Sequence, residues 1–171
     1  MSQDLGRLPA FDAAQDCVNV VVETPRMARG KFKYEPALGG FTLHKVLPLG
    51  FAFPYDFGFI PSTKGEDGDP LDVLLLLDVP VPMGTIVKTR LIGAIEAMQT
   101  QVDGRRLRND RLLGKAIVEG GAVTDITQLP PGLVDSIEAF FTDYDRRQGK
   151  RFEPLARRDA AGAIELVKAG A

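Results

Sequence analysis

Glycine and proline recur so often through the first three quarters of the chain that no long helix fits between them. The 171 residues include 18 glycines and 12 prolines, most of which lie before residue 131 and divide this part of the chain into short segments. Short segments bounded by turn residues are typical of strands rather than helices. The sequence therefore predicts a mainly β fold before residue 131.

The apolar and β-branched runs between these turns mark the expected strands. Asp103-Gly104 lies within Gln101–Arg105 and is a strong short signal for a hairpin turn. Gly39-Gly40 marks a second turn. We expect strands over residues 18–24, 32–36, 41–47, 72–79, 85–98 and 112–119, with an irregular extended segment over 51–60.

The period of the pattern changes after residue 130. Apolar residues recur at helical spacing over Pro131–Tyr144, and a shorter helical pattern covers Asp159–Lys168. We therefore expect an α+β fold that is mainly β: a small closed barrel with two C-terminal helices packed on it. The length suits one domain over residues 1–171, with residues 1–10 and 169–171 loosely held.

The composition excludes several classes of protein. Hydrophobic residues make up 44% and charged residues 26%, as in folded soluble domains, and the net charge of −2 argues against a general nucleic-acid-binding surface. No stretch approaches the roughly 20 apolar residues that a membrane span needs, so we expect a cytoplasmic protein that does not bind membranes. The single cysteine, Cys17, excludes an internal disulfide and is expected to be a buried, inert thiol.

Three aspartates stand immediately before a hydrophobic strand. Asp67 and Asp69 point the same way in an extended chain, Pro70 fixes the local dihedral angle, and Asp72 can return toward them. Carboxylates at such close quarters repel one another unless a cation sits between them. A hard divalent cation is the natural occupant, Mg²⁺ first, with Mn²⁺ or another divalent ion as alternatives.

Two other readings compete for these residues. Aspartate and glycine suit turns, so an acidic turn without a metal explains the segment alone about equally well. A calcium loop of the EF-hand type fits worse, because Asp72 occupies the position that requires glycine and Pro70 lies inside the loop.

Motifs elsewhere in the chain favour the metal site. Asp67-Gly68-Asp69-Pro70-Leu71-Asp72-Val73 resembles the motif of the family I soluble inorganic pyrophosphatases. Glu23-Thr24-Pro25, Lys33-Tyr34-Glu35 and the aromatic segment 53–61 resemble three further blocks of that family in order and spacing. The resemblance covers roughly residues 16–152. It implies a five-stranded barrel of the oligonucleotide-binding (OB) type, Mg²⁺-dependent hydrolysis of pyrophosphate or a related phosphoanhydride, and a homo-oligomer, commonly a hexamer in bacterial members.

The resemblance also implies roles for acidic residues. Asp67 and Asp72 match metal ligands, and Asp69 matches the residue that helps to deprotonate the attacking water. Glu23 and Glu35 match accessory metal-site carboxylates. Glu23 lies within an apolar strand, where an unpaired carboxylate would be costly, so we expect it to have a partner.

The substrate-binding residues implied by the resemblance are Lys33, Lys45 and Tyr144, and Lys33 and Tyr144 are also expected to act in catalysis. Lys45 stands where the family usually has arginine. The two lysines could instead be ordinary solvated side chains, and Tyr144 could simply be part of the core. His44, the single histidine, is expected to have a surface or packing role.

The chain departs from the family pattern at several positions. Phe57 replaces a tyrosine, Gln99 and Asn109 fall where the family has carboxylates, and Asp145 replaces a lysine. Asp103 or Asp110 could substitute if the loop over residues 99–111 is shifted. The arginines at 105, 106, 108 and 111 are expected to form a solvated loop; alternatively they supply phosphate-binding charge, with Arg111 as the candidate.

Three functions remain at this point. The first is pyrophosphate hydrolysis by a divergent pocket. The second is a pyrophosphatase-like protein with lost or altered activity that binds phosphate compounds or a protein partner. The third, binding of single-stranded nucleic acid on the barrel, is opposed by the acidic charge.

Overall fold

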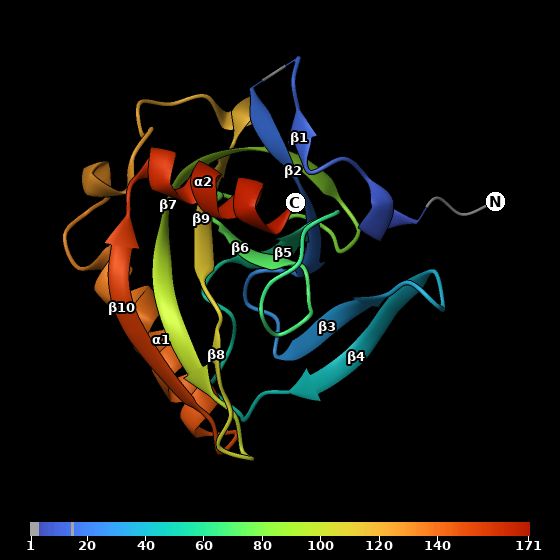
Figure 1. Ribbon diagram of the computed structural model, residues 1–171, viewed down its shortest axis with the longest axis vertical. Coiled ribbons are helices and arrows are strands. Elements are labelled where there is room, and N and C mark those ends of the chain that lie inside the picture. The colour runs from blue at the N-terminus through green and yellow to red at the C-terminus, as the bar shows by residue number, and fades with distance from the viewer. Residues whose placement is uncertain (1–3, 15) are drawn as a thin grey trace.

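Five strands close into a ring in the computed structural model, which describes residues 4–14 and 16–171 (Figure 1). In ring order they are β2 (Cys17–Thr24), β5 (Asp56–Ile60), β6 (Leu71–Leu75), β9 (Arg111–Ala116) and β7 (Ile86–Thr100). Strand β7 returns to pair with β2, and β6 and β9 run parallel while the other neighbours run antiparallel. The predicted five-stranded barrel is confirmed in this ring.

Strand β7 closes the ring because it is long and bent. Its first half pairs with β2, and its second half pairs with β10 (Arg151–Arg158) and β8 (Arg106–Arg108). The pairing with β9 shifts register between Leu91 and Gly93. A Cβ atom at Gly93 would lie 2.6 Å from the Ile126 Cβ and 2.7 Å from the Arg158 carbonyl oxygen, so only glycine fits at this bend.

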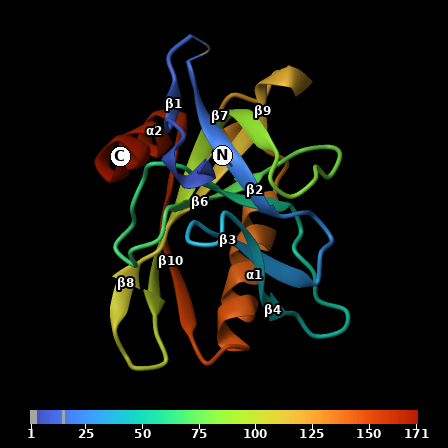
Figure 2. The same cartoon turned by 90° about the vertical axis from the view of Figure 1, so that its right-hand side faces the viewer.

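Strands β2 and β5, the second half of β6 and the middle of β7 are buried on both faces, which explains the continuous apolar runs in this part of the ring. On β6, Val73 and Leu75 pack in a core that includes residues of α2 (Ala160–Gly170), whereas Leu74 packs in a core that includes residues of α1 (Leu133–Arg146). The two helices lie toward opposite ends of the sheet (Figures 1 and 2). Both predicted helices are confirmed, with ends shifted by one or two residues.

Strand β10, between the two helices, was not predicted. Most of its side chains are exposed, and its sequence is rich in arginine and contains Pro154. Such a segment lacks the alternation of a half-buried strand, and its pairing with the long β7 decides its conformation.

No helix of the described residues is both long and apolar enough to cross a membrane.

A hairpin of β3 (Gly30–Glu35) and β4 (Gly40–Val46) forms a separate two-stranded sheet that stands away from the ring (Figure 1). The remaining elements are the short β1 (Phe11–Asp12), which pairs with β2, and 3₁₀ turns over Leu5–Arg7, Ile117–Glu119 and Ile126–Gln128.

Both ends of the chain make contacts with the body of the protein. The Tyr34 hydroxyl accepts a hydrogen bond from the Leu5 N–H, and the Asn19 side chain donates to the Pro9 carbonyl. The Gly170 carbonyl accepts from Lys64. Within the segments predicted to be loose, residues 1–3 lie outside the described residues.

Candidate active site

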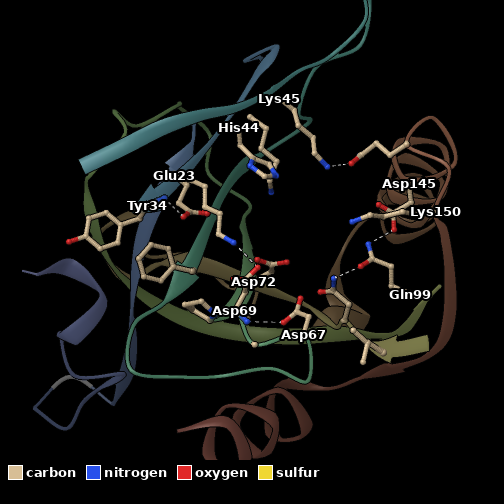
Figure 3. Close-up of a pocket in the computed structure, with 18 of the residues that line it drawn as sticks. Glu23, Tyr34, His44, Lys45, Asp67, Asp69, Asp72, Gln99, Asp145 and Lys150 are labelled. Atoms are coloured by element: carbon tan, nitrogen blue, oxygen red, sulfur yellow. Dashed lines mark hydrogen bonds and ion pairs between the residues drawn. The ribbon is translucent and has the colours of Figure 1, made fainter. Parts of the chain in front are cut away.

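One cavity of about 560 Å³ collects the residues that the sequence predicts for the site. It is lined by residues of the β3–β4 hairpin, the loop before β6, the β7–β8 turn and the end of α1 (Figure 3). The predicted residues that line it are Glu23, Lys33, Glu35, Lys45, Asp67, Asp69, Asp72, Arg111 and Tyr144. The three aspartates therefore share a common cavity, although residues far apart in the sequence build it.

A tight loop positions the aspartates before β6. The Gly65 N–H donates to the Asp69 carbonyl oxygen at 2.8 Å, and the Asp69 N–H donates to Asp67 Oδ1 at 3.1 Å. Gly68 adopts φ +88°, which a side chain would disfavour. Asp72 follows as the second residue of β6, so its carboxylate starts from a paired strand.

Two of the three aspartates already face a protein cation. Lys33 Nζ lies 2.7 Å from Asp69 Oδ2, and Arg111 lies 2.6 Å from Asp72 Oδ2. Asp67 has no cation within ion-pair distance in the described part of the chain. Burial raises the pKa of the Asp67 carboxyl, and the negative charges of Asp72 and Asp69 raise it further. Asp67 is thus the one of the three aspartates whose charge no protein cation within ion-pair distance balances in the described residues.

Glu23 lies at the buried edge of the cavity. Its side chain is only 7% exposed, and Oε1 accepts a hydrogen bond of 2.7 Å from the Tyr34 N–H. This contact confirms the expectation that Glu23 has a partner. Burial nevertheless raises the pKa of Glu23 to about 7, because one neutral N–H does not replace the water that a carboxylate loses.

A chain of hydrogen bonds fills the side of the cavity formed by β7 and α1. Gln99 donates to Asp145 at 2.5 Å, and Asn109 donates to the Gln99 Oε1 at 3.0 Å. Arg111 donates to Asn109 and to Asp72. Two neutral amides and the Arg111 guanidinium therefore connect the buried Asp145 to Asp72; Figure 3 shows the contact between Gln99 and Asp145.

The suggestion that Asp103 or Asp110 takes over a missing carboxylate position is wrong. Asp103 lies on the exposed β7–β8 turn, 2.7 Å from Arg105. Asp110 accepts from the Ala97 N–H at 2.9 Å and pairs with Arg108 at 2.9 Å. Neither is among the residues that line the cavity.

The four clustered arginines divide between solvent and cavity. Arg106 is exposed and pairs with Glu153, as a solvated loop predicts. Arg111 is only 4% exposed and its guanidinium carbon lies 4.7 Å from the centre of the Phe141 ring. The interpretation of the whole cluster as a solvated loop is therefore wrong for Arg111, which lines the cavity.

A β-bulge in the hairpin turns two consecutive side chains toward the cavity. Lys31 pairs with Lys45 and Phe32 with Leu43, so His44 is the extra residue. His44 and Lys45 both line the cavity, whereas successive residues of a regular strand point to opposite faces. His44 is exposed, as the expected surface role requires, and its place beside the cavity adds to that expectation.

Positive charge gathers on this wall, opposite the aspartates (Figure 3). Burial lowers the pKa of His44, and the charges of Lys45, Lys31, Lys33 and Lys150 lower it further. Lys45 donates a hydrogen bond to Gln148 just after α1. A wall of several cations is suited to bind a multiply charged anion.

Tyr144 joins the cavity to the aromatic core. Its ring centre lies 5.7 Å from that of Phe53 and 5.9 Å from that of Phe140. Burial raises the pKa of Tyr144 to about 12, so its hydroxyl keeps its proton near neutral pH and can donate a hydrogen bond. Tyr144 can therefore pack its ring in the core and also act in the cavity through its hydroxyl.

The acidic side of the cavity fits a hard divalent cation that is shared with a phosphate ligand. Among the described residues, no three acidic, imidazole or thiol groups come close enough together to hold a metal by themselves. Mg²⁺, however, is usually held by one or two carboxylates and completes its coordination with water and substrate phosphate oxygens. The oxygen donors of Asp67, Asp69 and Asp72 suit that mode, whereas Gln99 and Asn109 already use their side-chain oxygens as acceptors.

Comparisons with known proteins agree on one family. The family model described as inorganic pyrophosphatase matches residues 20–171. The inorganic pyrophosphatase of Thermus thermophilus is 35% identical, over 97% of this chain and 95% of the relative, and that of Synechocystis is 32% identical, over 96% and 95%. The crystal structure of the Thermus thermophilus inorganic pyrophosphatase superposes with a TM-score of 0.86 at 34% identity, covering 98% of this chain and 97% of the other. The Neisseria gonorrhoeae inorganic pyrophosphatase superposes with a TM-score of 0.84 at 29% identity, covering 95% and 94%.

Proposed function

Because the chain belongs to the inorganic pyrophosphatase family, we propose that it hydrolyses inorganic pyrophosphate to two phosphates in this cavity. The observation that carries the proposal is the arrangement of charge: Asp67, Asp69 and Asp72 share one cavity with a wall of cationic side chains. Pyrophosphate needs both kinds of group, because it is a multiply charged anion whose phosphorus must be approached by water.

Asp67 and Asp72 are the residues that would hold a divalent cation, with Glu23 and Glu35 as accessory carboxylates in the same cavity. We propose Mg²⁺ as that cation, because the donors are all hard oxygens. When bound, it would neutralise phosphate charge and lower the pKa of a water molecule in the site.

Asp69 is the residue proposed to take the proton of the attacking water. Lys33 Nζ lies 2.7 Å from its Oδ2 and holds the carboxylate in position at the cavity. The water oxygen forms a bond to one phosphorus, the bond from that phosphorus to the bridging oxygen breaks, and the second phosphate leaves with the bridging oxygen. Lys45 and the protonated hydroxyl of Tyr144 would hold phosphate oxygens by hydrogen bonds.

Phosphate release from Mg²⁺ and pyrophosphate tests this function. We expect turnover by the wild-type protein and a loss of at least about 100-fold in Asp69→Asn, the scale of a removed general base. Asp103→Asn is the matched control, because this aspartate lies outside the cavity. Wild-type turnover no higher than that of Asp69→Asn would contradict the proposal.

A second candidate is a pyrophosphatase-like protein that binds phosphate compounds or a protein partner without hydrolysis. The observation that favours it is the neutral hydrogen-bonded chain through Gln99 and Asn109. Calorimetric binding of pyrophosphate without any phosphate release would support this candidate. A panel of nucleotides and polyphosphates would reveal a different phosphoanhydride substrate.

The homo-oligomer and the cytoplasmic location remain predictions. Met27, Val46 and Leu49 are large apolar side chains that are more than half exposed in the single chain, which favours an assembly. Sedimentation analysis would give the number of subunits.

A further inference from the structure

Lys31 lies in the cavity wall, although the sequence patterns single out only its neighbour Lys33. Its ammonium nitrogen lies 3.9 Å from the centre of the Phe57 ring and 5.6 Å from that of the Phe53 ring. Contact with an aromatic face holds a cation in place without neutralising its charge. The half-buried Lys31 side chain thus presents a positioned ammonium group at the cavity.

The ammonium of Lys31 differs from the other cations that lie against the aspartates. Lys33 is paired with Asp69, and Arg111 with Asp72. Within residues 4–14 and 16–171, no carboxylate lies within ion-pair distance of the Lys31 ammonium and no acceptor lies within hydrogen-bond distance of it. A lysine ammonium carries three N–H donors, so its donors remain available to a ligand in the cavity.

The charges around Lys31 add a reason to expect an anionic ligand. Burial lowers the pKa of Lys31, and the positive charges of Arg111 and Lys33 lower it further, against the opposite effect of Asp72 and Glu23. A cation that has lost part of its hydration gains more from an arriving anion than an exposed lysine does. A bound phosphate group would supply the negative charge and the hydrogen-bond acceptors that the Lys31 ammonium lacks.

We propose that Lys31 is a substrate-binding residue whose ammonium donates hydrogen bonds to phosphoryl oxygens of the bound diphosphate. The inference rests on the proposed function. The ring face of Phe57 supports the ammonium, and Lys31 is one of the residues that line the cavity. Lys31 thereby adds a cation to the wall that Lys45 and His44 form across the bulge.

Calorimetry with methylenediphosphonate, a diphosphonate that cannot be hydrolysed at its bridge, tests the proposal in the full chain. Lys31→Met removes the charge and keeps an unbranched side chain that packs on aromatic rings. We expect its Kd to rise by about 10-fold or more, the effect of losing a charged hydrogen bond. Lys31→Arg should recover part of the affinity, and Lys168→Met, an exposed lysine paired with Glu165, should leave it unchanged.

The salt dependence of binding separates a charge contact from a packing role. If Lys31 binds phosphate, the affinity of Lys31→Met should fall less steeply with added salt than that of the wild type. An unchanged Kd and salt slope in folded Lys31→Met would overturn the proposal, and so would a wild-type protein that does not bind the diphosphonate. Failure of the proposed function would give a different result: the wild-type protein would bind the diphosphonate but would release no phosphate from pyrophosphate.

Discussion

The buried carboxylate of Glu23 should make the protein less stable as the pH rises, and removing its charge should reverse this. Burial raises the pKa of Glu23 from an ordinary value of 4.5 to about 7. Below pH 4.5 the folded and unfolded states are both protonated, so there is no penalty. Between these values the unfolded chain loses the proton first, and stability falls; above pH 7 the full penalty applies.

The size of the penalty follows from the shift. A rise from 4.5 to about 7 corresponds to about 3 kcal/mol, at roughly 1.4 kcal/mol for each pKa unit. Glu23→Gln removes the charge and keeps an oxygen that can accept from the Tyr34 N–H, 2.7 Å away in the wild type. We therefore expect Glu23→Gln to be about 3 kcal/mol more stable than the wild type at pH 8 and equally stable at pH 4.5.

Urea unfolding in the presence of EDTA measures this difference. For a urea slope of roughly 1–3 kcal/mol/M, the midpoint of Glu23→Gln should lie about 1–3 M above that of the wild type at pH 8. Glu35→Gln is the matched control, because this glutamate is exposed at the end of β3. A stability difference that does not grow between pH 4.5 and pH 8 would refute the reasoning.

Three further substitutions test other parts of the structure. Gln99→Asp places a second carboxylate beside the buried Asp145 and should cost about 2 kcal/mol at pH 8 but less at pH 5, as measured by thermal unfolding. Gly58→Ala places a Cβ atom 2.3 Å from the Val21 carbonyl oxygen and should cost about 3 kcal/mol, whereas an unchanged melting temperature would contradict the close approach. Tyr144→Phe keeps the ring packing and removes the hydroxyl, so kcat/KM for pyrophosphate should fall about 10-fold while the melting temperature stays close to that of the wild type.

Local signals in the sequence predict the parts of the fold that local chemistry decides. Four of the five ring strands follow from apolar or β-branched runs between turn residues, whereas β5 lies in the segment over residues 51–60 that was expected to be irregular. The Gln101–Arg105 turn forms as Asp103-Gly104 predicts, with Gly104 at φ +85°. Strand β10 could not be found in this way, because its exposed, arginine-rich sequence carries no strand pattern. Pairing with β7, more than fifty residues earlier, determines it.

In the candidate site, too, the sequence predicts the residues that are close together in the chain and misses contacts between distant ones. Asp67, Asp69 and Asp72 are close in the sequence, so their common cavity could be predicted from the turn that carries them. The contact between Gln99 and Asp145 joins residues that lie far apart in the chain. The position of Lys31 depends on the ring of Phe57, which the sequence pattern of β3 does not contain.

Anomalous diffraction from crystals grown with Mn²⁺ and methylenediphosphonate tests the central claim most directly. The claim is that the carboxylates before β6 hold a divalent cation together with a diphosphate ligand. We expect a manganese peak bounded by Asp67 and Asp72, with the diphosphonate between that peak and the lysines of the hairpin. Diphosphonate bound elsewhere, or bound in the cavity without manganese at these aspartates, would contradict the account.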